Sequence, residues 1–191
     1  MLPDYLPQGL ENGRTRNLMA LIEPDFDIVD IANRLAKINR FAGATRFPLS
    51  VATHSVVVSY LAPKGLELVG LLHDISESFG IGDMIRPVKQ ISPAFKELEL
   101  AIEKQLEVPF PCLKDIALIK QADNRATAIE AYIHRGEWPD WSKPEEGGFV
   151  GYDYPLNAHE SRLTYTFYEG ELSWQMSAAA FVLRYNQLVN R

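Results

Sequence analysis

The stretch Leu71-Leu72-His73-Asp74-Ile75-Ser76-Glu77 decides how the rest of this 191-residue chain is interpreted. An imidazole and a carboxylate follow each other directly inside an apolar segment that we expect to be helical. Burying a carboxylate without a partner is costly, so buried charges are usually paired or bind a metal ion. The pair His73-Asp74 therefore predicts a bound cation or a charged partner at this point of the fold.

Two further residues could complete such a site, His54 upstream and Asp123 downstream, each on its own helix-like segment. Taken alone, His54 fits a core histidine bonded to a backbone carbonyl, and Asp123 fits an ion pair with Lys120 or Arg125. Taken together with the first pair, they offer two imidazoles and two carboxylates. This donor set suits a divalent transition metal such as Zn, Mn, Fe, Co or Ni, with open positions for water and a phosphate oxygen.

Composition narrows the class of protein. The formal charge of −6 argues against binding a nucleic-acid polymer, although a few local cations could still hold a small phosphorylated substrate. The single cysteine, Cys112, cannot form an intramolecular disulfide, which favours a reducing compartment. There is neither a signal-peptide pattern nor an apolar run of about 20 residues. We expect a cytoplasmic protein without a membrane span.

The apolar spacing predicts an all-α fold, a single compact helical bundle over residues 1–191. Its core is expected over about 27–135, and two C-terminal helices over about 158–190. Asp27, Ser50 and Ser92 are candidate N-caps, the last followed by proline at the first helical position. Residues 1–26 are expected to form an irregular arm. Helices are predicted over 28–38, 51–61, 66–79, 93–106 and 114–134, with loops over 40–48, from Gly80 past Pro87, and over 136–156.

The order His54, His73-Asp74, Asp123 resembles the signature of the HD-domain phosphohydrolases, over roughly residues 27 to 135. The bare His-Asp dipeptide is weak evidence of this family, whereas the full set in order is specific. The resemblance implies a helical bundle in which these four side chains hold the metal. It also implies hydrolysis of a phosphate ester by a water molecule that the metal activates.

Two more motifs extend the resemblance. In HD-domain deoxynucleotide hydrolases, a Glu at the place of Glu77 assists the attacking water. The stretch from Gly82 to Lys89 looks like the family loop that supplies an Asp near the water, here Asp83, and a Lys for phosphate, here Lys89. One extra residue between Glu77 and Asp83 departs from the family pattern and affects Asp83 more than Lys89. The alternative for Lys89 is a solvated loop cation.

The pair Arg40-Phe41 resembles the Arg-aromatic pair of the 5′-deoxynucleotidase group, where the Arg touches phosphate or sugar and the ring packs on the nucleoside. Phe41 stands where that group commonly has Trp. The alternative makes Phe41 a core anchor and Arg40 a cation at a helix C-terminus. Together with Lys89, Arg40 and Arg46 are expected to offset charge on the phosphoryl oxygens.

The size of the chain and the stretch Arg40–Arg46 look most like small phage HD-domain proteins, among them dATP triphosphohydrolases of phages that use 2-aminoadenine. The resemblance implies hydrolysis of dATP to deoxyadenosine and triphosphate in the host cytoplasm. The expected cofactor is Zn, Co or Mn, and a second ion, Mg, could accompany the triphosphate. A homo-oligomer is expected, with a hexamer as one option. The alternatives are a 5′-deoxynucleotidase, a cyclic-nucleotide phosphodiesterase, and a non-catalytic nucleotide-binding module that a metal stabilises.

Overall fold

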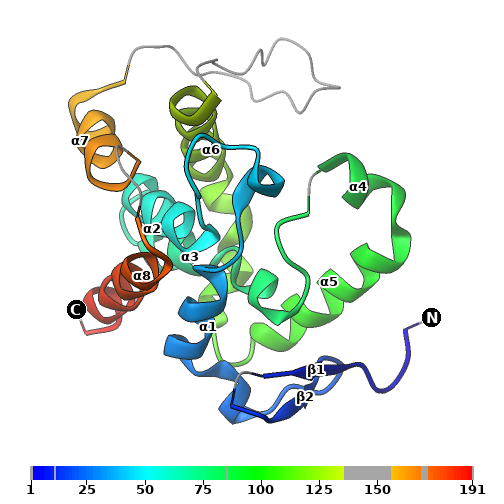
Figure 1. The fold of residues 1–191 in the computed structure, drawn as a ribbon. Coiled ribbons are helices and arrows are strands. Elements are labelled where there is room, and N and C mark those ends of the chain that lie inside the picture. The colour runs from blue at the N-terminus through cyan, green and yellow to red at the C-terminus, as the bar shows by residue number, and fades with distance from the viewer. Residues whose placement is uncertain (1, 11, 85, 136–155, 169–171, 191) are drawn as a thin grey trace.

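The computed structural model describes residues 2–10, 12–84, 86–135, 156–168 and 172–190, and helices dominate this part of the chain (Figure 1). This confirms the predicted all-α class. The expected irregular arm instead contains a short antiparallel hairpin of β1 (Pro7–Gly9) and β2 (Thr15–Asn17), followed by the 3-10 helix η1 (Glu23–Phe26). The predicted loop over 136–156 falls almost wholly outside the described residues.

Local capping signals place the first helices. The side chain of Asp27 accepts a hydrogen bond from the Asp30 amide at the start of α1 (Ile28–Leu35), which ends three residues earlier than predicted. Ser50 accepts from the Thr53 amide and opens α2 (Val51–Leu61), whose bounds match the prediction. Every residue from Val51 to Ser59 is buried, because α2 packs against several other helices, chiefly α3, α6 and α8.

Three predicted elements were wrong in detail. The helix expected over 66–79 breaks at His73-Asp74 into α3 (Glu67–Leu72) and the 3-10 helix η3 (Ile75–Phe79), since Asp74 leaves the α-helical backbone region. The expected loop after Gly82 contains α4 (Arg86–Ile91), which tolerates a proline in its first turn. The first part of the helix expected over 114–134 is the 3-10 helix η4 (Pro111–Ile119), and only then does α6 (Lys120–Arg135) begin.

The remaining helices match their sequence signals. Pro93 begins α5 (Pro93–Leu106), although the Ser92 side chain makes no capping hydrogen bond. The two predicted C-terminal helices are α7 (Ala158–Phe167) and α8 (Trp174–Val189). In the part of the chain that the structure describes, none of the helices has the length and apolar character needed to cross a bilayer.

The N-terminal hairpin is fastened to the segment η3 by one buried arginine. Arg16 on β2 donates a hydrogen bond to the Ser78 carbonyl at 2.9 Å and another to Gln8 at 2.7 Å. Its guanidinium also lies 4.1 Å from the centre of the Phe79 ring. The hairpin therefore braces the 3-10 helix that carries Glu77.

A glycine sets the close approach of α2 and α3. A Cβ atom on Gly70 would lie 3.1 Å from Ala62 Cβ, Ser59 Cα and the Val58 carbonyl oxygen, all on or next to α2. The Gly70 carbonyl also accepts a hydrogen bond from His73 Nδ1 at 2.8 Å. Gly70 thus helps to fix the distance between the helix that carries His54 and the turn that carries His73.

Substituting Gly70 by Ala should destabilise the protein. Alanine inside a helix normally stabilises by about 0.5–1 kcal/mol, but overpacking costs about 1–3 kcal/mol, which leaves a net loss of up to about 2.5 kcal/mol. Urea unfolding measures this difference. Gly9→Ala is the matched control, because no atom lies within 4 Å of its added Cβ. A Gly70→Ala protein as stable as Gly9→Ala would contradict the close approach.

Candidate metal centre

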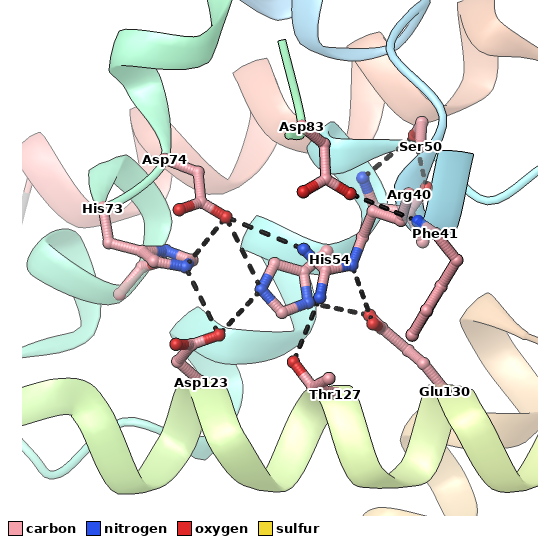
Figure 2. A network of polar contacts seen from close by, with 12 residues as sticks. Arg40, Phe41, Ser50, His54, His73, Asp74, Asp83, Asp123, Thr127 and Glu130 are labelled. Atoms are coloured by element: carbon pink, nitrogen blue, oxygen red, sulfur yellow. Dashed lines mark hydrogen bonds and ion pairs between the residues drawn. The ribbon is translucent and has the colours of Figure 1, made fainter. Parts of the chain in front are cut away.

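Side chains from three separate parts of the chain converge on one small space (Figure 2). His54 comes from α2, His73 from the turn that ends α3, and Asp123 from α6. One donor atom from each of these three residues lies within 4.8 Å of the other two. Asp123 Oδ1 lies 3.2 Å from His54 Nε2 and 3.8 Å from His73 Nε2. This group could hold a metal ion.

Asp74, the fourth predicted ligand, lies beside this group. Its Oδ2 atom is 3.1 Å from His73 Nε2 and 3.7 Å from His54 Nε2. The structure therefore brings together all four residues predicted from the sequence, with Asp74 facing the same two ring nitrogens as Asp123. Coordination by Asp74 itself stays a prediction.

The hydrogen bonds of the two histidines prepare their Nε2 atoms for a cation. His54 Nδ1 lies 2.8 Å from Glu130 Oε1, and His73 Nδ1 lies 2.8 Å from the Gly70 carbonyl oxygen. Because a carbonyl and an ionised carboxylate can only accept, each Nδ1 carries the hydrogen. Both Nε2 atoms are buried and make no hydrogen bond with any residue that the structure describes, although carboxylate oxygens lie close. Imidazoles that ligate metals have this arrangement, with Nδ1 held and Nε2 directed at the ion.

The electrostatics of the group favour a positive charge at its centre. Burial lowers the pKa of His73, but Asp74 and Asp123 outweigh it and raise the pKa to about 10. Burial and Arg40 lower the pKa of His54, whereas Glu130 and Asp123 raise it, and the net direction is upward. Burial would raise the pKa of Asp123, yet the two imidazoles hold it far below its usual range. The carboxylates that raise the pKa of both imidazoles would also favour a bound cation at this point.

Glu77 lies next to this group in a buried position. Its Oε2 atom has no hydrogen-bond partner. Burial, followed by the charges of Asp74 and Asp83, raises the pKa of Glu77 to about 9, against the opposing effect of Arg40 and Lys89. A carboxyl group whose pKa is raised in this way can hold a proton near neutral pH and exchange it with a reacting group.

Asp83 makes a hydrogen bond that the sequence did not indicate. Its Oδ2 atom accepts a hydrogen bond from the Phe41 amide at 3.2 Å. Phe41 and Ala42, in the 3-10 segment η2 (Arg40–Gly43), have φ angles of 54° and 52°. Residues with a Cβ are strained there by roughly 1–2 kcal/mol each. Asp83 thus tethers a strained turn at the edge of the site, and its predicted place near a water molecule stays a prediction.

Arg40 is buried, and each of its three side-chain nitrogens faces a group of the protein. Its Nε donates to Glu130 Oε2 at 2.8 Å and its Nη2 to Thr127 Oγ1 at 3.0 Å, while Nη1 lies 3.9 Å from Asp74 Oδ2. Phe41 packs against the core cluster that α2 and α6 share, in agreement with the core-anchor alternative. Contacts of Arg40 and Phe41 with a substrate stay predictions.

The other cations near the site each have a partner of their own in the structure. Lys89 lies on α4 rather than in a loop, donates to Glu99 at 2.8 Å, and interacts electrostatically with Glu77 and Asp74. Arg46 is exposed and lies over the ring of Phe47 in its own loop, 5.5 Å from the ring centre. The exposed Lys120 donates to Asp123 Oδ2 at 2.6 Å, so the predicted ion pair exists alongside the contact of Oδ1 with the histidines.

Sequence reasoning missed three members of this network. Thr127 and Glu130 project from α6 on the same side as Asp123 (Figure 2), as their spacing of four and seven residues from Asp123 allows. That spacing was the available signal. Tyr168, which donates to Glu130 Oε1 at 2.8 Å, comes from the residue after α7, and no local pattern indicated it.

No family model matches the chain. The uncharacterized protein RCAP_rcc00048 of Rhodobacter capsulatus is 32% identical over 161 residues, which cover 78% of this chain and 81% of that protein. The uncharacterized protein YfdR of Escherichia coli is 38% identical over 79 residues, or 41% of this chain and 44% of YfdR.

A metal ion should stabilise the folded protein through this group. After treatment with a chelator, Co²⁺ at a hundred times its Kd should add about 2.7 kcal/mol and raise Tm by about 5–10 °C. Asp123→Asn should remain folded and lose most of this shift. Differential scanning fluorimetry measures both. The same shift in Asp123→Asn would locate the ion elsewhere.

Proposed function

The chain belongs to the same family as RCAP_rcc00048 of Rhodobacter capsulatus, and on that premise we propose that it is a metal-dependent phosphohydrolase of the HD-domain type. The observation that carries the proposal is the convergence of His54, His73, Asp74 and Asp123 around two buried, unbonded Nε2 atoms. A metal that only stabilised the fold would not need a buried carboxyl group such as Glu77 beside it. That placement favours catalysis over a non-catalytic binding module.

The proposed reaction is the hydrolysis of dATP to deoxyadenosine and triphosphate. Water adds to the α-phosphorus, the bond to the 5′ oxygen breaks, and the released oxygen takes up a proton. The choice of dATP rests on the resemblance to the small phage proteins. Because the substrate is a free nucleotide, the proposal also places the protein in the cytoplasm, that of the host if the chain is viral. A homo-oligomer, with six copies as one option, belongs to the same proposal.

Each residue of the site has a separate role in the proposed reaction. His54, His73, Asp74 and Asp123 would hold Zn, Co or Mn, which when bound lowers the pKa of water from about 16 towards about 7 and polarises a phosphoryl oxygen. Glu77 would orient the attacking water and take up or return its proton. Lys89 would offset charge on the phosphate oxygens. A second ion, Mg, would arrive with the triphosphate as part of the substrate.

A 5′-deoxynucleotidase is the second candidate, and the pairing of the cations favours it. Arg40 is bonded to Glu130 and Thr127, and Lys89 is bonded to Glu99. A triphosphate needs more compensating positive charge than a monophosphate, and these two cations are already partly neutralised. Incubation with dATP and with dAMP, each with Co, Mn, Zn or Mg, separates the two activities by their products, triphosphate or phosphate. Binding of nucleotides without turnover would favour the binding module.

Substituting Glu77 by Ala should lower turnover by about 10²–10⁴-fold while leaving metal affinity unchanged, because loss of a general acid–base has effects of this size. The measurements are steady-state hydrolysis and Co²⁺ titration of the same preparation. Glu97→Ala, at an exposed position of α5, is the control and should retain activity. Unchanged turnover in Glu77→Ala would refute the catalytic role of this residue.

A further inference from the structure

Glu130 connects two parts of the site through a single buried carboxylate. Its Oε1 accepts from His54 Nδ1 and from the Tyr168 hydroxyl, both at 2.8 Å, and its Oε2 accepts from Arg40 Nε at 2.8 Å. The side chain is completely buried, so water has no access to replace any of these three donors. Figure 2 shows Glu130 on the side of His54 opposite to Asp123.

We propose that Glu130 is a positioning residue that keeps the His54 ring in the tautomer required for cation binding and holds Arg40 beside the same site. The inference deepens the proposed function, because it rests on a metal ion bound between His54, His73 and Asp123. Glu130 itself does not touch the ion.

The inference rests on the hydrogen-bonding capacity of an ionised carboxylate, which accepts hydrogen bonds and donates none. Glu130 can only accept hydrogen bonds, so His54 must keep a hydrogen on Nδ1, which leaves Nε2, 3.2 Å from Asp123 Oδ1, as the atom that would bind the ion. Partners that orient ligating histidines in this way typically contribute 10–100-fold to metal affinity. The same carboxylate neutralises the buried guanidinium of Arg40, so one residue fixes both groups.

The isosteric change Glu130→Gln tests the tautomer directly. Arg40 can only donate, so the amide oxygen of Gln must face Arg40 and the amide nitrogen must face His54 and Tyr168. The Tyr168 hydroxyl can rotate and accept. His54 can accept at Nδ1 only by moving its hydrogen to Nε2, where that hydrogen occupies the direction of the ion. The side-chain volume and the contact with Arg40 stay, whereas the ligand atom is lost.

The experiment is a Co²⁺ titration of the chelator-treated protein, followed by the visible absorption of the bound ion. Glu130→Gln should bind Co²⁺ 10–100-fold more weakly than the unchanged protein. Tyr168→Phe removes the neighbouring donor to the same oxygen and should stay close to the unchanged protein.

Glu160→Gln is the matched control for the loss of a buried charge. Glu160 accepts from Arg125 at 2.6 and 2.7 Å, and it is not among the groups that shift the pKa of His54 or His73. This variant should lower Tm and leave Co²⁺ affinity unchanged. A general loss of stability would therefore not imitate the expected result.

A second pair of variants covers the case in which Glu130→Gln does not fold. Arg40→Met removes the guanidinium that Glu130 neutralises and leaves the bond between Glu130 and His54. It also removes a positive charge 3.9 Å from Asp74, so Co²⁺ should bind at least as tightly as before. The double variant Arg40→Met/Glu130→Met, which leaves His54 Nδ1 without the carboxylate acceptor, should then bind 10–100-fold more weakly than Arg40→Met.

Each outcome decides a different claim. Equal Co²⁺ affinity with and without Glu130, in folded protein of either pair, overturns the positioning role. If the unchanged protein binds neither Co²⁺ nor Mn²⁺ nor Zn²⁺, the metal centre fails and the inference falls with it. If the unchanged protein binds Co²⁺ but hydrolyses no nucleotide, the proposed function fails while the role of Glu130 stands or falls on its own titration.

Discussion

The bond between His54 and Glu130 is the constraint on which the rest of the site depends. His54 has no exposed surface, and its two ring nitrogens face two carboxylates of the same helix, Asp123 at Nε2 and Glu130 at Nδ1. A buried imidazole between two acidic groups is stable only if the helices hold all three in register and positive charge is present. The central position of α2, its packing against α6 and the close approach of α3 at Gly70 all serve this geometry.

Local signals in the sequence were sufficient for much of the fold. Asp27 and Ser50 cap helices where the pattern predicted them, because a cap depends on a hydrogen bond to an amide three residues away. The break in the helix at His73-Asp74 could not be predicted from such local signals. There the backbone leaves the helix, and His73 bonds to a carbonyl of the preceding turn while its Nε2 faces α2 and α6. Tertiary contacts, which periodicity does not encode, favour that conformation.

The site, like the fold, was predicted where local signals decide it and missed where contacts between distant elements decide it. The predicted ligands His54, His73, Asp74 and Asp123 were chosen by residue type and order, and the structure brings these residues together. The residues that hold these four side chains in place were not predicted from the sequence. Glu130 and Tyr168 act through contacts between elements distant in the sequence, and only the helical spacing of Glu130 from Asp123 offered a hint. Side chains that touch a ligand carry recognisable chemistry, whereas those that orient them are recognised by position.

The hairpin of β1 and β2 has a bearing on how the protein is handled in the laboratory. Arg16 of this hairpin donates a hydrogen bond to the backbone carbonyl of Ser78, one residue after Glu77. The strands β1 and β2 therefore belong to the scaffold of the site, even though they lie far from its histidines in the sequence. Trimming this stretch for crystallisation, or fusing a bulky affinity tag against it, would loosen the segment that presents Glu77.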